Sequence, residues 1–290
     1  MKKKINSDLI ENFLKHLKDD TDKKLSSQTL KTYENIGKNL PFNITTNQNT
    51  IIKKLKEIYD NPNTLSLYLN MIILIRRYNN EETDKLIKLR NSLRDAIIKE
   101  RKDNLDLFDD TLPSLKKIED ELDNLTGIQY IINYLIINLG LRNGDMNLKF
   151  VKSFDNTDTN QIKIKGKKIL LLIKDYKTEK SFGEKELEVI DDKFLNQLKN
   201  MKLKNDDYLI TMKNGDRINN ITTWNDKVKK LTISNLGQNK IIKIKIKDLI
   251  NNKQFDKLEQ LSKSRGTSLQ VLLTSYNLHN GNKDEKEKEE

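Results

Sequence analysis

One arginine, Arg142, is placed where it could hold an anionic group rigidly. It follows Gly140, which ends an apolar run as glycine does at a helix C-terminus. Within that run the apolar residues recur at the three-to-four spacing of a buried helix: Ile128, Ile131, Ile132, Leu135, Ile136 and Leu139. A guanidinium fixed at the end of such a helix suits a phosphate, because its planar fork can donate paired hydrogen bonds. The alternative is an arginine that is solvated or paired with a carboxylate.

The scarcity of two residue types excludes several kinds of site. The chain has no cysteine, which excludes disulfides, cysteine-bound zinc and thiol catalysis. His16 and His279 are the only histidines, which argues against a histidine metal site and against a Ser-His-Asp triad. We therefore expect no metal site built on cysteine or histidine.

The charge of the chain favours a polyanionic partner. Its 54 lysines and arginines exceed its 43 acidic residues, giving a formal net charge of +11. A lysine-rich, solvated surface produced by codon bias is the alternative. No apolar run reaches the ~18 residues needed to span a membrane. The initial MKKKINSD has no apolar segment behind it, so we expect no secretory signal and an intracellular protein.

Residues 1–80 predict a compact helical unit. Four helices are expected, over residues 5–17, from Ser26 or Ser27 to Leu40, over 48–59 and over 65–78. A long, charged helix and linker follows over 81–112, and Leu112-Pro113-Ser114 restarts the chain with a helix-start signature. We place the first domain at 1–105 and the second at 106–280. The low-complexity segment 281–290 is predicted to be disordered.

The second domain mixes helices with a small sheet. Helices are expected over 114–125 and 127–139, and a small antiparallel sheet from the β-rich segments 161–165, 168–176 and 186–189. Residues 192–201 and 218–230 read as helices. Residues 242–247 alternate isoleucine with lysine and predict a further strand before a helix over 248–264. A last helix begins at Thr267 or Ser268. The fold class is therefore mainly α with a small antiparallel β-sheet (α+β).

The order of these elements resembles the tyrosine recombinase (phage-type integrase) family. The segments LSSQTLKTYENIGKNL and NPNTLSLYLNMIILIRR resemble its helical core-binding domain. YLIINLGLRNGDMNL resembles the segment that opens its catalytic domain, ILLLIKDYKTEKSFGEKELEV the hairpin with its lysine, and RGTSLQVLLTSYN the segment that ends in its nucleophile. The resemblance covers about residues 5–280, and its specificity comes from the order of these motifs.

The resemblance implies a site and an activity. Arg142 matches the first arginine of the family, Asp145 its acidic position, Lys177 its lysine and Tyr276 its nucleophile. A divergent integrase would break and rejoin duplex DNA through a 3′-phosphotyrosine intermediate, without a cofactor, as a dimer or tetramer on DNA. A catalytically inactive DNA-binding protein with the recombinase fold is the alternative.

The sequence departs from the family at its second arginine and both histidines. Lys247 stands where the first histidine is expected, Ile250 where the second arginine is expected, and Thr267 at the later histidine or tryptophan position. A shifted register would place Lys245 or Lys247 at the arginine position. The catalytic set of the family is therefore incomplete in this chain. Removal of one hydrogen-bond donor that stabilises the transition state typically costs ~10²–10³ in rate.

Each candidate also has a plain structural interpretation. Tyr276 shares a helical stripe with Leu272 and Leu273, which is typical of core packing. Lys177 in a hairpin is typical of a solvated lysine, and Lys247 would lie on the solvated face of the predicted strand. The sequence predicts that Arg142, Lys177 and Tyr276 converge on one phosphate-sized site.

Overall fold

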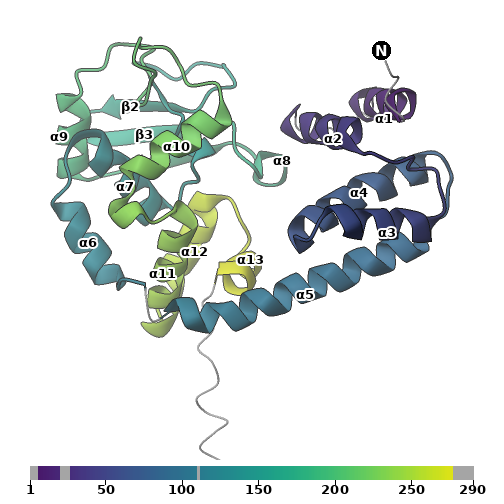
Figure 1. Cartoon of the computed structure of the whole chain (residues 1–290). Coiled ribbons are helices and arrows are strands. Elements are labelled where there is room, and N and C mark those ends of the chain that lie inside the picture. Colours follow the sequence, from purple (N-terminus) through teal and green to yellow (C-terminus); the bar gives the residue numbers. More distant parts are fainter. Residues whose placement is uncertain (1–5, 20–26, 110–111, 277–290) are drawn as a thin grey trace, which may run out of the picture. The chain divides into compact units, whose positions relative to one another are not determined.

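The computed structural model describes residues 6–19, 27–109 and 112–276 (Figure 1). The chain divides into two compact units, Met1–Leu105 and Asp106–Glu290. Each has a hydrophobic core of its own, so each is described by itself. The predicted tail 281–290 lies outside the described residues.

The first unit is helical, as predicted. Its helices are α1 (Ser7–Asp19), α2 (Ser27–Asn39), α3 (Gln48–Ile58), α4 (Pro62–Tyr78) and the start of α5 (Asp84–Asp109). Helix α4 contacts α1 and α2 and carries Leu69, Met71, Ile72 and Ile75, all fully buried. The Asn61 side chain caps α4 by accepting hydrogen bonds from the Asn63 and Thr64 backbone N–H groups. Pro62 fits directly after the cap because the first helical residue needs no N–H donor.

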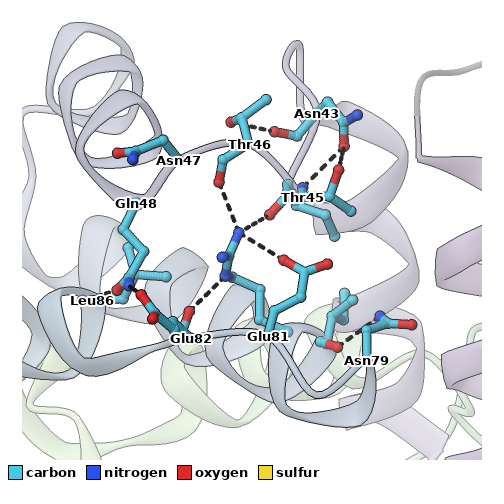
Figure 2. Close-up of polar contacts among 12 residues, drawn as sticks. Asn43, Thr45, Thr46, Asn47, Gln48, Asn79, Glu81, Glu82 and Leu86 are labelled. Atoms are coloured by element: carbon cyan, nitrogen blue, oxygen red, sulfur yellow. Dashed lines mark hydrogen bonds and ion pairs between the residues drawn. The ribbon is translucent and has the colours of Figure 1, made fainter.

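Arg76, near the end of α4, binds parts of the first unit together instead of facing solvent. Its Nη1 donates to the carbonyls of Ile44 and Thr46, each at 2.8 Å, and its Nε donates to the Glu82 carbonyl at 2.9 Å. Glu81 is 2.9 Å away and supplies the counter-charge. Figure 2 shows Thr46, Glu81 and Glu82 around this network. A buried arginine is tolerated here because carbonyls and a carboxylate satisfy it.

The second unit contains the remaining helices and all the strands found in the described residues. Its helical elements are α6 (Leu115–Asp123), α7 (Gly127–Leu139), η1 (Gly144–Met146), α8 (Glu179–Phe182), α9 (Asp192–Asn200), α10 (Ile221–Leu231), η2 (Ile233–Asn235), α11 (Gln238–Asn251), α12 (Phe255–Arg265), α13 (Leu269–Val271) and η3 (Leu272–Tyr276). Its strands are β1 (Lys149–Phe150), β2 (Gln161–Lys165), β3 (Lys168–Ile173) and β4 (Lys185–Val189). The prediction of a mainly helical chain with a small sheet is confirmed.

The sheet has four strands in the order β1-β2-β3-β4, and it is mixed. Strands β2, β3 and β4 pair antiparallel, as predicted, whereas β1 pairs parallel with β2. The purely antiparallel description is therefore wrong at this edge. Within the connection between β1 and β2, Asp155 N–H donates to the Gln161 side chain at 3.0 Å. Parallel pairing requires this connection to return the chain to the end of the sheet at which β1 begins.

The isoleucine–lysine alternation at 242–247 does not form a strand. These residues lie inside α11, so the expected strand is wrong. Over so short a segment a two-residue period is also compatible with a broad helical face. Ile242, Ile246 and Leu249 share that face at helical spacing and are buried. Lys247 lies on a helix instead of the solvated side of a strand.

Helix α7 is the centre of the second unit. Its Ile131, Ile132, Leu135, Ile136 and Ile137 are fully buried. Helices α6, α9, α10, α11 and α12 all contact it (Figure 1). The end of α7 is therefore held from several sides, and the residues that follow it inherit a fixed position.

Candidate functional site

Helix α7 ends at Gly140, as predicted, in a left-handed conformation with φ 66°. A Cβ at this position would lie 2.6 Å from Leu261 Cδ1 of α12, so both the backbone and the close packing require glycine. The Gly140 N–H donates to the Ile136 carbonyl at 3.0 Å, closing the helix. The chain then turns against α12 and presents Arg142 at that contact.

Arg142 is half-buried and faces the C-terminal end of α12. Its backbone N–H donates to Asp145 Oδ2 at 3.1 Å, and its Nη1 donates to the Arg265 carbonyl at 2.6 Å. Asp145 is itself almost fully buried, in the short helix η1. The arginine predicted to hold a phosphate is thus fixed by both its backbone and its guanidinium.

A lysine that sequence reasoning did not select lies beside Arg142. Lys185, the first residue of β4, is buried with 8% of its surface exposed. Its Nζ donates to the Ser264 carbonyl at 3.1 Å and lies 3.9 Å from Asp145 Oδ2. It also lies 3.7 Å from the centre of the Tyr176 ring. Burial lowers the pKa of Lys185 to about 8, helped by Arg142 and Arg265 and opposed by Asp145.

Arg265, the last residue of α12, is also missing from the predicted set. It is fully buried, its Nη1 donates to the Gly140 carbonyl at 2.6 Å, and its Nη2 lies 3.5 Å from Asn239 Oδ1. Its own carbonyl accepts from Arg142. The two arginines therefore join the end of α7 to the end of α12 in both directions.

We call Arg142, Asp145, Lys185 and Arg265 the cationic cluster. Burial raises the pKa of Asp145, while Lys185, Arg142 and Arg265 act to lower it. The cluster holds three cations and one carboxylate, so these four side chains carry a net charge of +2 when all are ionised. Fixed cations of this kind stabilise charge on a phosphoryl group. They also suit the carbonyl-rich C-terminus of α12, whose dipole attracts positive charge.

The other predicted site residues lie on different elements. Lys177 is exposed, between β3 and α8, and its neighbour Thr178 donates a hydrogen bond to the Gly266 carbonyl. Lys247 is half-buried on α11. Tyr276 ends η3, a segment that packs against α11. The Tyr276 side chain lies outside the described part of the structure, so its predicted convergence with Arg142 and Lys177 stays a prediction.

Of the two missed residues, the sequence carries a signal for the burial of Lys185 but not for that of Arg265. Lys185 stands two and four residues before Leu187 and Val189, so strand alternation places it on their buried face. Arg265 directly precedes Gly266, which caps α12 with φ 60°. The glycine marks the end of the helix, but only the packing of α12 against α7 shows that Arg265 points inward.

Comparison with solved structures finds chains of similar fold. No protein-family profile matches the chain, and no curated protein matches it by sequence. A solved structure described as "Crystal structure of XerA recombinase" has a TM-score of 0.37 and 13% identity, covering 98% of this chain and 97% of that chain. Among the described residues, no helix is long and apolar enough to cross a membrane.

Proposed function

We propose that this protein is a DNA strand transferase of the tyrosine recombinase type, which acts on duplex DNA through a phosphotyrosine intermediate. The observation that carries the proposal is the cationic cluster, in which Lys185 lies 3.9 Å from the buried Asp145 carboxylate and the charges of Arg142 and Arg265 act on that carboxylate as well. The last described segment of the same unit ends at Tyr276. A phosphodiester needs fixed cations, an oxygen nucleophile and a proton donor, and this unit offers residues for each role.

The proposed step is an in-line displacement at phosphorus. The Tyr276 oxygen forms a bond to phosphorus as the bond from phosphorus to the 5′ oxygen breaks, and the phenolic proton passes to water. The phosphoryl charge is stabilised by Arg142. The released 5′ oxygen takes a proton from a lysine ammonium. The reverse reaction by another 5′ hydroxyl rejoins the strand, so no cofactor is needed.

Lys185 suits the role of proton donor better than Lys177. It is buried next to Arg142, and its lowered pKa makes its ammonium a stronger acid near neutral pH. Lys177 is exposed on the connection before α8 and would instead contact the DNA backbone. Lys247, on the helix against which η3 packs, would add positive charge near the Tyr276 segment.

We also propose self-association on DNA, as a dimer or tetramer.

A DNA-binding protein without strand-transfer activity is the second candidate. The observation that favours it is that Arg142 and Lys185 already donate to backbone carbonyls of α12. In that case the cluster would serve to hold helix ends together. Binding would then depend on salt, as phosphate contacts do, with no covalent product.

The deciding experiment is incubation with nicked suicide duplexes of many sequences, followed by denaturing electrophoresis. Wild-type protein should form a covalent adduct, and Tyr276→Phe should form none because it lacks the attacking oxygen. Tyr208→Phe, which removes a hydroxyl elsewhere in the same unit, is the matched control and should retain the adduct. Salt-dependent binding without an adduct from any duplex would overturn the strand-transfer proposal and support the second candidate.

The same assay compares the two lysines. Lys185→Met should slow adduct formation by on the order of 10²–10⁴, the usual contribution of a positioned acid. Lys177→Met should change the rate far less while weakening DNA binding. The reverse order would assign the proton donor to Lys177.

A further inference from the structure

Arg265 makes a reciprocal contact with the residues that position Arg142. Its Nη1 donates to the Gly140 carbonyl, two residues before Arg142, and its own carbonyl accepts from Arg142 Nη1, both at 2.6 Å. A Cβ on Gly140 would lie 3.6 Å from Arg265 Cβ, so the two backbones are in close contact. Movement of the Arg265 side chain would therefore move the backbone from which Arg142 projects.

Stability alone does not account for an arginine at this position. Arg265 is among the largest fully buried side chains of the described structure. Its charge acts on the same buried groups, Asp145 and Lys185, as the charge of Arg142. Because desolvating a charge is costly, an apolar side chain of similar volume often packs a helix end at no loss. An apolar side chain at this position would pack the helix end but would supply no charge to the groups beside Arg142.

Arg76 shows what a buried arginine with a purely structural role looks like in this chain. Its guanidinium meets three backbone carbonyls, and Glu81 gives it a counter-charge at 2.9 Å. Figure 2 shows Glu81 and Glu82 among the residues around that network. Arg265, by contrast, donates to the Gly140 carbonyl beside the Arg142 segment, and its charge acts on Asp145 and Lys185. The comparison makes Arg76 a matched control for the loss of a buried guanidinium.

We propose that Arg265 is a positioning residue of a phosphodiester site, where it fixes the Gly140–Arg142 backbone and supplies a second buried positive charge behind Arg142. This inference rests on the proposed function, because the ligand is the phosphodiester of DNA. Arg265 is fully buried, so it acts through Arg142 and Lys185 and does not itself touch the phosphate. Ile250 on α11, which stands where the family's second arginine is expected, carries no charge. Arg265 would supply that charge from the end of α12.

The test compares Arg265→Met with Arg265→Lys and Arg76→Met in the full chain, using nicked duplex DNA. Arg265→Met should lower the rate of adduct formation at saturating DNA by on the order of 10²-fold, with DNA affinity changed much less. Arg265→Lys should recover part of the rate, because it restores the charge. Arg76→Met should reduce stability without this selective loss of rate. A rate at saturating DNA that is unchanged in Arg265→Met would overturn the inference.

A second readout does not depend on strand transfer. The titration of Lys185 can be followed by NMR of ¹³C-methylated lysines, with Lys185→Arg used to assign the signal. Because Arg265 lowers the pKa of Lys185, Arg265→Met should raise that pKa, and Arg76→Met should leave it unchanged. Nicked duplex should also raise the pKa of Lys185 in the wild type, and less in Arg265→Met.

These outcomes separate the two proposals. If the wild type forms no adduct but the Lys185 titration responds to DNA through Arg265, strand transfer is wrong and the phosphodiester site stands. If nicked duplex does not change the Lys185 titration in the wild type, the inference is overturned whatever the adduct assay gives. Should Arg265→Met not fold, Arg265→Lys decides: a rate and a response to DNA both equal to wild type would show that the guanidinium has no positioning role.

Discussion

At the scale of single residues, the buried Lys185 and the half-buried Lys245 should make stability depend on pH. Burial lowers the pKa of Lys185 and of Lys245 to about 8 in the folded chain, below the usual 10.5. The unfolded chain therefore binds more protons between about pH 8 and pH 10.5. Because stability rises with pH wherever the unfolded state binds more protons, the free energy of unfolding should increase across this window.

Substitution of either lysine should reduce that pH dependence. Lys185→Met and Lys245→Met should each flatten the rise, since each removes a contribution of at most about 3 kcal/mol for a shift of this size. Urea unfolding at several pH values measures the effect. The exposed Lys177→Met is the control and should preserve the slope. A slope unaltered in both buried variants would contradict the burial of these ammonium groups.

The sequence reveals some of these residues and conceals others for physical reasons. Arg142 is predictable because Gly140 marks the end of an apolar helix, and the position just after a glycine cap is local information. Lys185 is available from strand alternation, but a lysine on a buried face contradicts the usual exposure of that residue type. Arg265 is hidden because its burial depends on α12 packing against α7, which are far apart in the chain.

At the scale of elements, the junction after α12 depends on a glycine. Gly266 has φ 60°, and a Cβ there would lie 2.6 Å from Tyr176 Cε2 and 3.3 Å from Lys185 Nζ. Gly266→Ala should therefore combine backbone strain with displacement of the residues packed on the cationic cluster. We expect a loss of stability of roughly 1–3 kcal/mol and a slower adduct reaction.

A matched glycine separates the two contributions. Gly166, in the turn between β2 and β3, has φ 65°, and a Cβ there would meet no atom within 4 Å. Gly166→Ala should show the backbone strain alone, with the adduct rate retained. Chemical denaturation and the adduct assay measure the two variants in parallel. Equal loss of adduct formation in both would show that the Gly266 contact has no specific effect on the site.

Prediction of helices and strands succeeded where the apolar residues followed a single helical or strand period. It failed where both periods fitted the same residues. The spacing in α7 and the alternation in β2 and β4 correspond to the observed elements. Residues 242–247 alternate over too few positions to distinguish a strand from a helix, and the apolar residues flanking them complete the helical face of α11. The parallel pairing of β1 depends on how the connection to β2 turns back, which short-range pattern does not specify.

At the scale of the whole molecule, the chain contains two hydrophobic cores that share no described residue. Leu69 belongs to the first and Ile136 to the second, and both are fully buried. Leu69→Ala and Ile136→Ala should each destabilise the unit that contains them by roughly 2–5 kcal/mol, through lost burial and the cavity left behind. Because the cores are separate, hydrogen exchange should accelerate mainly in the mutated unit. Native-state hydrogen exchange of both full-length variants, read by mass spectrometry, measures the exchange rate of each core. The control is Leu67→Ala, on the exposed side of α4, which should accelerate exchange in neither core. Equal acceleration of both cores by one substitution would show that the two units unfold as one.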